Sequence, residues 1–285
     1  RKIRIGINGF GRIGRCAFKQ FIDEGRFEVA AINDLVEVDD LAYLLKYDSV
    51  HGTYTRAVEH DGDSITVDGE QTMVFNHEQP SQIPWGDLGA EIVIESTGAF
   101  RGREQAAGHL EAGARRVIIS APSADADGMF VPGVNHDRYD REQHHVVSLA
   151  SCTTNCLAPV AKVLHEQFEI EYLFMTTVHA YTASQTVHDV SARKRRRGRA
   201  AAESIIPTST GAARATEQVL PELAGRVNGL AMRVPVTDGS ITDITATLSR
   251  DATVEQINEA LGAAAQSDAL RGILQVSPEE IVSRD

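Results

Sequence analysis

The chain has 285 residues, of which 42% are hydrophobic and 24% are charged, and its formal net charge is −12. This composition is that of an ordinary globular protein, and it excludes collagen-like, coiled-coil and largely disordered chains. The acidic balance argues against a general binder of nucleic acids or anionic membrane surfaces, because both carry negative charge. At about 150 residues per domain, the length predicts two domains.

Cysteine content and the N-terminal segment bear on the cellular compartment. The chain has three cysteines, an odd number that argues against a disulfide framework. No apolar run reaches the length of about 18 residues that a transmembrane helix requires. We expect no signal peptide, because Arg1-Lys2-Ile3-Arg4 leads directly into a glycine-rich segment. Together these features predict a cytoplasmic protein.

In the first half of the chain, short β-branched runs alternate with helical patterns. Strands are predicted at 3–7, 28–32, 92–94, 117–119 and 146–148, and helices at 12–21 and 102–114. This alternation predicts a doubly wound, Rossmann-type parallel sheet. Residues 55–75 differ, because Asp68-Gly69 separates two β-like runs. That pattern predicts a hairpin that forms an antiparallel insertion in the sheet domain.

The second half has longer strands and fewer helices. Strands are predicted at 172–182, 229–236 and 241–248, and helices at 153–167, 210–219 and 254–265, with a helix-like stretch at 199–206. Runs of strands with few intervening helices predict an α+β domain with a mainly antiparallel sheet. The boundary is expected near Leu149, which gives a first domain over 1–149 and a second over 150–285.

The segment Gly9-Phe10-Gly11-Arg12-Ile13-Gly14 matches the G-x-G-x-x-G pattern between a predicted strand and a predicted helix. Gly9 allows a tight turn, Gly11 lets the backbone approach a pyrophosphate, and Gly14 lets the helix pack on the strand. Asp34 ends the next strand about 20 residues on, where a carboxylate binds the ribose of NAD and repels the 2′-phosphate of NADP. The alternative is a glycine-rich turn with Asp34 as a helix cap.

A cysteine lies where a helix is predicted to begin. In Ser151-Cys152-Thr153-Thr154-Asn155-Cys156, the hydroxyl residues favour a helix start, so helix-terminal N–H groups would lower the pKa of Cys152. Cys156, one turn further on, is expected to be more buried. Cys152 could instead be a small core residue, since free cysteines are often buried. A metal site is disfavoured because no second pair of ligands matches the two cysteines.

His179 is the candidate base for Cys152, because it lies in a predicted strand beside small polar residues. A single histidine in a strand is nevertheless more often structural. The segment Arg193 to Arg199 has six cations in seven positions. Such runs are usually solvated tails or nucleic-acid arms, but this one lies in mid-chain between ordered-looking stretches.

At these residues the sequence closely resembles the phosphorylating glyceraldehyde-3-phosphate dehydrogenases. The resemblance runs in register from Ile3 to Asp285, and the matching segments are 7–15, 45–52, 95–98, 119–122, 150–158, 200–207, 209–213 and 232–235. It implies that glyceraldehyde 3-phosphate is oxidised with NAD and inorganic phosphate to 1,3-bisphosphoglycerate, a step of glycolysis and gluconeogenesis. It also implies a homotetramer, with no membrane partner and no specific nucleic-acid partner.

The resemblance implies roles for individual residues. Cys152 resembles the nucleophile that forms a thiohemiacetal and then a thioester, and His179 resembles the group that activates the thiol and takes the hydroxyl proton. The implied substrate phosphate binders are Thr182 and Arg233, and the implied inorganic phosphate binders are Ser151, Thr153, Arg197, Thr210 and Gly211. The implied cofactor contacts are Arg12, Ile13, Asp34, Thr97 and Ser120, in addition to Gly9 and Gly11. Thr97 could instead be a plain strand-end cap.

The sequence also departs from the family. Ser184 replaces an acidic residue near the substrate phosphate, and Glu78 stands where a basic residue is common near the adenine. Val190-Ser191 replaces a Leu-Pro pair, and a serine there can receive a 2′-phosphate, so NADP is an alternative cofactor. Family members continue beyond the equivalent of Asp285, so we expect a truncated form that is poorly stable and weakly active. The alternatives are an erythrose-4-phosphate dehydrogenase, a non-catalytic nucleotide or RNA binder, and a truncated inactive product.

Overall fold

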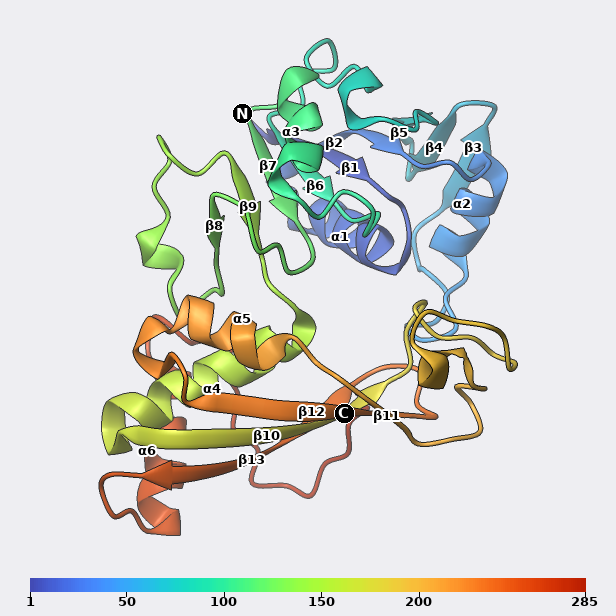
Figure 1. The fold of residues 1–285 in the computed structure, drawn as a ribbon. Coiled ribbons are helices and arrows are strands. Elements are labelled where there is room, and N and C mark those ends of the chain that lie inside the picture. The colour runs from blue at the N-terminus through green and yellow to red at the C-terminus, as the bar shows by residue number, and fades with distance from the viewer. The chain divides into compact units, whose positions relative to one another are not determined.

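The computed structural model describes residues 1–285, which form two compact units (Figure 1). The first unit comprises residues 1–129 and 139–150, and the second comprises residues 130–138 and 151–285. None of the helices combines the length and the apolar character that crossing a membrane requires.

The first unit is built on a nine-stranded sheet, sheet A, with the strand order β3-β4-β5-β2-β1-β6-β7-β9-β8. Its strands are β1 (Ile3–Asn8), β2 (Phe27–Asn33), β3 (Val58–Asp61), β4 (Ser64–Val67), β5 (Glu70–Phe75), β6 (Ile92–Glu95), β7 (Arg116–Ile119), β8 (Gly128–Met129) and β9 (Val146–Ser148). Only the β3-β4 and β4-β5 pairs are antiparallel. Asp68 and Gly69 both have positive φ in the β4-β5 turn, as a two-residue type I′ hairpin turn requires. The predicted Rossmann-type sheet and its inserted hairpin are confirmed.

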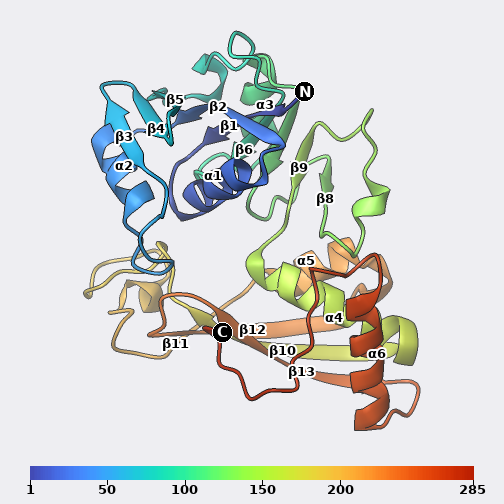
Figure 2. The same ribbon diagram turned by 180° about the vertical axis from the view of Figure 1, so that it is seen from behind.

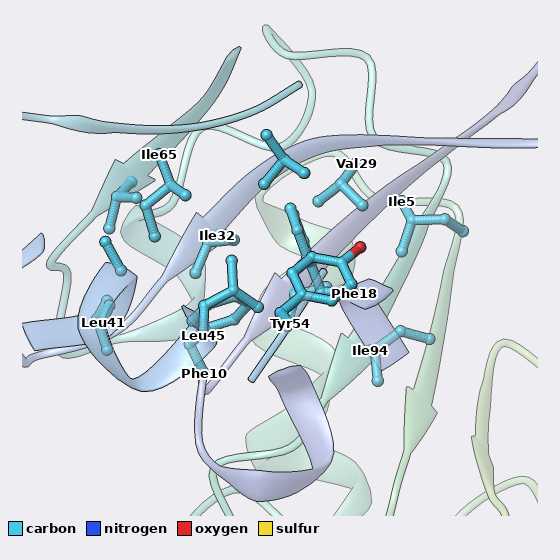
Figure 3. Packing of buried hydrophobic residues seen from close by; sticks show 14 residues of the cluster. Ile5, Phe10, Phe18, Val29, Ile32, Leu41, Leu45, Tyr54, Ile65 and Ile94 are labelled. Carbon is cyan, nitrogen blue, oxygen red and sulfur yellow. The ribbon is translucent and has the colours of Figure 1, made fainter. Parts of the chain in front are cut away.

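Helices cover sheet A because its central strands are apolar on both faces. The helices are α1 (Arg12–Glu24), α2 (Val38–Lys46) and α3 (Arg103–Glu111). Ile5 and Ile7 of β1 pack in one buried cluster with Phe18 of α1 (Figure 3). Gly6 lies between them and faces the opposite side, since alternate strand residues point to opposite faces. There the Trp85 ring lies so close that a Cβ at Gly6 would come within 2.6 Å of it.

The second unit is built on sheet B, with the order β11-β12-β10-β13. Its strands are β10 (Ile170–Ala180), β11 (Ile206–Thr208), β12 (Val227–Val234) and β13 (Ser240–Leu248). The β10-β12 pair is parallel and the other two pairs are antiparallel, in agreement with the predicted α+β class. Helix α4 (Cys152–Phe168) packs against β10, α5 (Ala212–Val219) and α6 (Val254–Gln266). Figure 2 shows α4 and α5 on the same side of sheet B.

Two local predictions are wrong. Residues 199–205 form turns and a bridge instead of a helix, and Ile206 begins β11. Their N–H groups bond elsewhere: that of Ala200 donates to Asp189 Oδ1 at 2.9 Å and that of Ala201 donates to the Thr186 carbonyl at 2.9 Å. Cys156 is exposed instead of buried, because the buried face of α4 carries other residues, namely Leu157, Ala158, Ala161 and Leu164.

Candidate active site and nucleotide-binding pocket

The chain enters α4 through a backbone conformation that is unusual for its residue. Ala150 has a φ of 59° and is only 2% exposed. A left-handed conformation costs a residue with a Cβ about 1 kcal/mol or more, and such strain clusters at functional sites. Ser151 then caps the helix by accepting a hydrogen bond from the Thr154 N–H at 3.0 Å. Cys152 is therefore the first helical residue, at the positive end of the helix dipole.

A histidine on β10 faces this cysteine. The His179 Nε2 atom lies 3.2 Å from Cys152 Sγ. His179 Nδ1 lies 2.7 Å from the Ala180 carbonyl oxygen, and Nδ1 must be the donor because a carbonyl only accepts. The hydrogen bond from His179 lowers the pKa of the Cys152 thiol against the opposing effect of burial. The same hydrogen bond raises the pKa of His179, so the geometry favours a thiolate next to an imidazolium.

Arg233 lies beside the histidine on the neighbouring strand, since β10 and β12 pair His179 with Arg233. Its Nη1 donates to the Ala180 carbonyl at 3.0 Å and to Thr182 Oγ1 at 3.3 Å, while its buried Nε has no hydrogen-bond partner. Burial lowers the pKa of Arg233, Arg197 lowers it further, and Cys152 raises it. The two guanidinium groups and the sulfur therefore lie within electrostatic reach of one another. Two neighbouring guanidinium groups favour an anion beside them.

Most of the other predicted phosphate binders lie at the N-terminal ends of α4 and α5, whereas Arg197 lies in the short 3-10 turn Arg195–Gly198. Thr153 follows Cys152 and is buried, and Gly211 is the N-cap of α5. The surroundings of Gly211 are open, because a Cβ there would meet nothing within 4 Å. Arg197 donates from Nε to Thr208 Oγ1 at 3.2 Å, and Thr210 Oγ1 accepts from the Ala212 N–H at 3.1 Å.

A second candidate site lies in the first unit, at the carboxyl ends of the central strands of sheet A. A cavity of about 320 Å³ there is lined by four of the predicted cofactor residues, Gly9, Gly11, Asp34 and Thr97. The other three lie outside its lining: Arg12 and Ile13 in the first turn of α1, and Ser120 directly after β7. The carboxyl edge of a doubly wound sheet is the usual place for a nucleotide.

The residues around this cavity fit a dinucleotide. Gly9 has a φ of +91°, and a Cβ there would lie 2.5 Å from the Thr97 nitrogen, so only glycine is accommodated. A Cβ at Gly11 would meet nothing within 4 Å, which leaves room for a phosphate against the backbone. Asp34 Oδ2 accepts a hydrogen bond from the Phe10 N–H at 2.6 Å, and this bond holds the carboxylate beside the glycine turn.

The sequence patterns did not single out Asn8, His77 or Phe100, which also line the cavity, and they gave Glu78 no role. Asn8 directly follows an apolar run at the end of β1, and polar residues at the ends of parallel strands are the signal that could have identified it. The other residues come from loops, whose path the sequence does not reveal.

The sequence patterns also gave no role to Asp48, which holds Arg12. Arg12 Nη1 lies 2.7 Å from Asp48 Oδ1, and the Asp48 side chain is only 3% exposed. Burial would raise the pKa of Asp48, but hydrogen bonds from Arg12 and from the N–H groups of His51 and Val50 hold that pKa well below its ordinary value. The carboxylate thus stays ionised and fixes the position of the guanidinium.

If Arg12 contacts NAD, as the resemblance implies, replacing Asp48 with asparagine is expected to weaken NAD binding about three- to tenfold, because Arg12 loses a charged partner worth about 1 kcal/mol. Calorimetric titration with NAD measures the effect, and kcat at saturating NAD should stay within about twofold. Glu24→Gln is the matched control, since Glu24 pairs with Arg26 on the exposed surface of the same unit. Equal NAD affinities for D48N and the unmodified protein would contradict the prediction.

Comparison with known proteins follows the same division of the chain. Residues 3–103 match the family model described as "Glyceraldehyde 3-phosphate dehydrogenase, NAD binding domain", and residues 151–285 match that of the C-terminal domain. The chain is 54% identical over 283 residues to glyceraldehyde-3-phosphate dehydrogenase from Geobacillus stearothermophilus, covering 99% of this chain and 84% of that protein. It is 51% identical over 284 residues to that of Streptomyces coelicolor, with the same coverage. It is 50% identical to glyceraldehyde-3-phosphate dehydrogenase B of Aspergillus oryzae, again covering 99% and 84%. The chain belongs to the glyceraldehyde-3-phosphate dehydrogenase family.

Proposed function

We propose that this protein oxidises and phosphorylates D-glyceraldehyde 3-phosphate to 1,3-bisphosphoglycerate with NAD as its cofactor. The observation that carries the proposal is the 3.2 Å contact between Cys152 Sγ and His179 Nε2, with Arg233 on the adjacent strand. An activated thiol attacks an aldehyde carbon, and a neighbouring cation retains a phosphorylated substrate. Similarity over 99% of this chain to proteins named glyceraldehyde-3-phosphate dehydrogenase supports the same reaction.

In the proposed mechanism, the Cys152 thiolate attacks the aldehyde carbon and forms the S–C bond of a thiohemiacetal. The His179 imidazolium donates its proton to the new alkoxide, which the Cys152 N–H at the start of α4 also stabilises. Neutral His179 takes that proton back as the aldehyde hydrogen leaves as hydride, and Cys152 then carries the acyl group as a thioester. Inorganic phosphate attacks the thioester carbonyl, and the low pKa of Cys152 makes its thiolate a good leaving group.

Two anion subsites are proposed around this dyad. Arg233 and Thr182, which are hydrogen-bonded to each other, would hold the phosphate of the substrate. The subsite for the attacking phosphate would consist of five residues, Ser151, Thr153, Arg197, Thr210 and Gly211. The proximity of Arg197 to Arg233, which lowers the pKa of the latter, supports adjacent subsites for two phosphates.

NAD is proposed to bind through Gly9, Gly11, Arg12, Ile13, Asp34, Thr97 and Ser120, and when bound it supplies the hydride acceptor. Asp34 lies at the end of β2, where its negative charge favours the ribose hydroxyls of NAD over the 2′-phosphate of NADP. We further propose that residues 1–149 form the NAD-binding domain and residues 150–285 the catalytic domain. A homotetramer is proposed from family membership. A cytoplasmic location is proposed from the three free cysteines, since a reducing compartment preserves free thiols.

Absorbance of NADH formed from glyceraldehyde 3-phosphate tests the proposed reaction. Turnover should require inorganic phosphate, since the thioester otherwise persists on Cys152, and NAD should support a higher kcat/KM than NADP. Erythrose 4-phosphate serves as the comparison substrate under the same conditions. The proposal fails if NADH forms equally fast without phosphate, or if erythrose 4-phosphate has the higher kcat/KM.

A further inference from the structure

A fully buried polar network lies below the nucleotide-binding pocket in the first unit. Trp85, Glu95 and His109 are each at most 1% exposed. Trp85 Nε1 donates to His109 Nδ1 at 2.9 Å, and His109 Nε2 lies 3.0 Å from Glu95 Oε2. None of the three residues lines the pocket. Buried polar groups that are hydrogen-bonded to one another favour one defined arrangement, because each group is costly if it is left unpaired.

The tryptophan determines where the histidine carries its proton. An indole N–H can only donate, so His109 Nδ1 must accept and therefore carries no proton. The proton of the neutral ring is then on Nε2 and points to the Glu95 carboxylate. Without the indole N–H, the ring could carry its proton on Nδ1, and the Nε2 lone pair would face the carboxylate oxygen.

Glu95 links His109 by hydrogen bonds to residues that line the pocket. Its Oε2 accepts from Asn8 Nδ2 at 2.6 Å in addition to His109. Its Oε1 accepts from the backbone N–H of Thr97 at 2.9 Å and from Thr97 Oγ1 at 2.5 Å. Asn8 and Thr97 both line the pocket. Three of the four donors to this carboxylate therefore come from pocket residues.

The network continues across the ends of neighbouring strands. Asn33 Nδ2 donates to Asn8 Oδ1 at 2.8 Å, and the Asn33 amide also bonds the backbone N–H and carbonyl of His77 at 2.8 and 3.0 Å. The bonds thus connect the carboxyl ends of β6, β1 and β2 with the segment after β5, and these four strands are neighbours in sheet A. This chain of hydrogen bonds therefore holds four residues that line the pocket: Asn8, Asn33, His77 and Thr97.

We propose that Trp85, His109 and Glu95 are positioning residues that set the geometry of the cofactor pocket through Thr97 and Asn8. The inference rests on the proposed function, since it assumes that the pocket takes NAD. In this arrangement Trp85 fixes the His109 tautomer, His109 and Asn8 orient one carboxylate oxygen, and the other oxygen holds Thr97. The network would therefore control NAD affinity without touching the cofactor and without acting on the reacting thiol.

Trp85→Phe removes one donor and keeps most of the ring volume. It is expected to raise the dissociation constant of NAD about five- to tenfold, as loss of one buried hydrogen bond would, and to leave kcat at saturating NAD within about twofold. Glu95→Gln should have a larger effect, because its amide N–H₂ would face donors. His109→Gln, which keeps a donor toward Glu95, should bind NAD more tightly than His109→Leu.

Ile65→Ala is the matched control for general loss of stability. Ile65 is 0% exposed in β4 of the same unit and belongs to a different hydrophobic cluster from Trp85. Calorimetry of NAD binding, urea unfolding and steady-state kinetics on all variants give the readouts, and the calorimetry does not depend on aldehyde turnover. The proposal holds if W85F loses more NAD affinity than I65A at equal or smaller loss of stability.

Three results would overturn the proposal. In the first, W85F and I65A lose NAD affinity in proportion to their loss of stability. In the second, W85F lowers kcat while the dissociation constant of NAD stays unchanged. In the third, His109 carries its proton on Nδ1. Nitrogen NMR of the imidazole in the unmodified protein reports that tautomer directly. Absence of glyceraldehyde 3-phosphate oxidation with NAD binding intact would instead contradict the proposed function alone.

Discussion

Replacing Cys152 with serine is expected to lower kcat about 10⁴-fold or more while NAD still binds. A serine hydroxyl at the start of α4 would lie beside the same imidazole, but its proton is far harder to remove than that of a thiol whose pKa the His179 contact lowers. Its acyl derivative would also be an ester, which phosphate attacks much more slowly than a thioester. NADH absorbance at saturating substrates measures kcat, and calorimetric NAD titration shows that the pocket remains intact.

Cys156→Ser is the matched control for this substitution. Cys156 lies one turn further along α4, is exposed, and its Sγ lies 3.8 Å from Thr242 Oγ1 of β13. Since it plays no part in the proposed mechanism, kcat should stay within about twofold. Comparable losses in C152S and C156S, or full turnover by C152S, would show that Cys152 is not the nucleophile.

The substitution His179→Asn is expected to lower kcat about 10²- to 10⁴-fold, the usual contribution of a general acid–base group. Asparagine places its amide nitrogen near the position of Nδ1, so the bond to the Ala180 carbonyl can persist while the contact with Cys152 Sγ is lost. His165→Asn serves as the control, because His165 is also hydrogen-bonded to the backbone, where its Nδ1 accepts from the Ile170 N–H, and it lies at the other end of α4.

The same variant should change how thiol reactivity depends on pH. In the unmodified protein the Cys152 pKa is lowered, so alkylation by iodoacetamide should stay fast as the pH falls below the ordinary thiol range. His179→Asn removes the largest cause of that lowering and leaves the opposing effect of burial, so the pKa of Cys152 should rise. We expect the alkylation rate at pH 7 to fall about tenfold or more, whereas an unchanged pH midpoint would contradict the assignment.

Local sequence signals were sufficient to predict most elements and to place the proposed nucleophile at the start of a helix. The glycine spacing at Gly9 and Gly11, the Asp68-Gly69 turn and the hydroxyl residues before Cys152 each impose a local backbone conformation that neighbouring residues favour. The 3.2 Å contact between Cys152 and His179 is different, because β10 must be packed against α4 to bring the two side chains together. No local pattern encodes that distance, so the sequence could supply candidates for the dyad but not its geometry.

Tertiary contacts explain what the sequence patterns did not predict. Residues 199–206 were predicted as helix-like, but Asp189 and Thr186 bind the N–H groups of Ala200 and Ala201. Helix α2 was not predicted, although its buried Leu41 and Leu45 have helical spacing. His109 was not singled out, because its hydrogen-bond partners Trp85 and Glu95 belong to two other segments.

The pairing order of sheet B has a consequence for synthesis on the ribosome. Strand β10, which carries His179, pairs with β12 from Val227 onward and with β13 as far as Leu248, so both neighbours are made long after it. Closing such long loops is slow compared with forming local contacts. In the nascent chain, residues 1–150 contain all the strands of sheet A, so this sheet can form while β10 still lacks both partners. The proposed catalytic dyad should therefore be assembled only after β13 has emerged, which makes reactivity of the Cys152 thiol a late marker of folding.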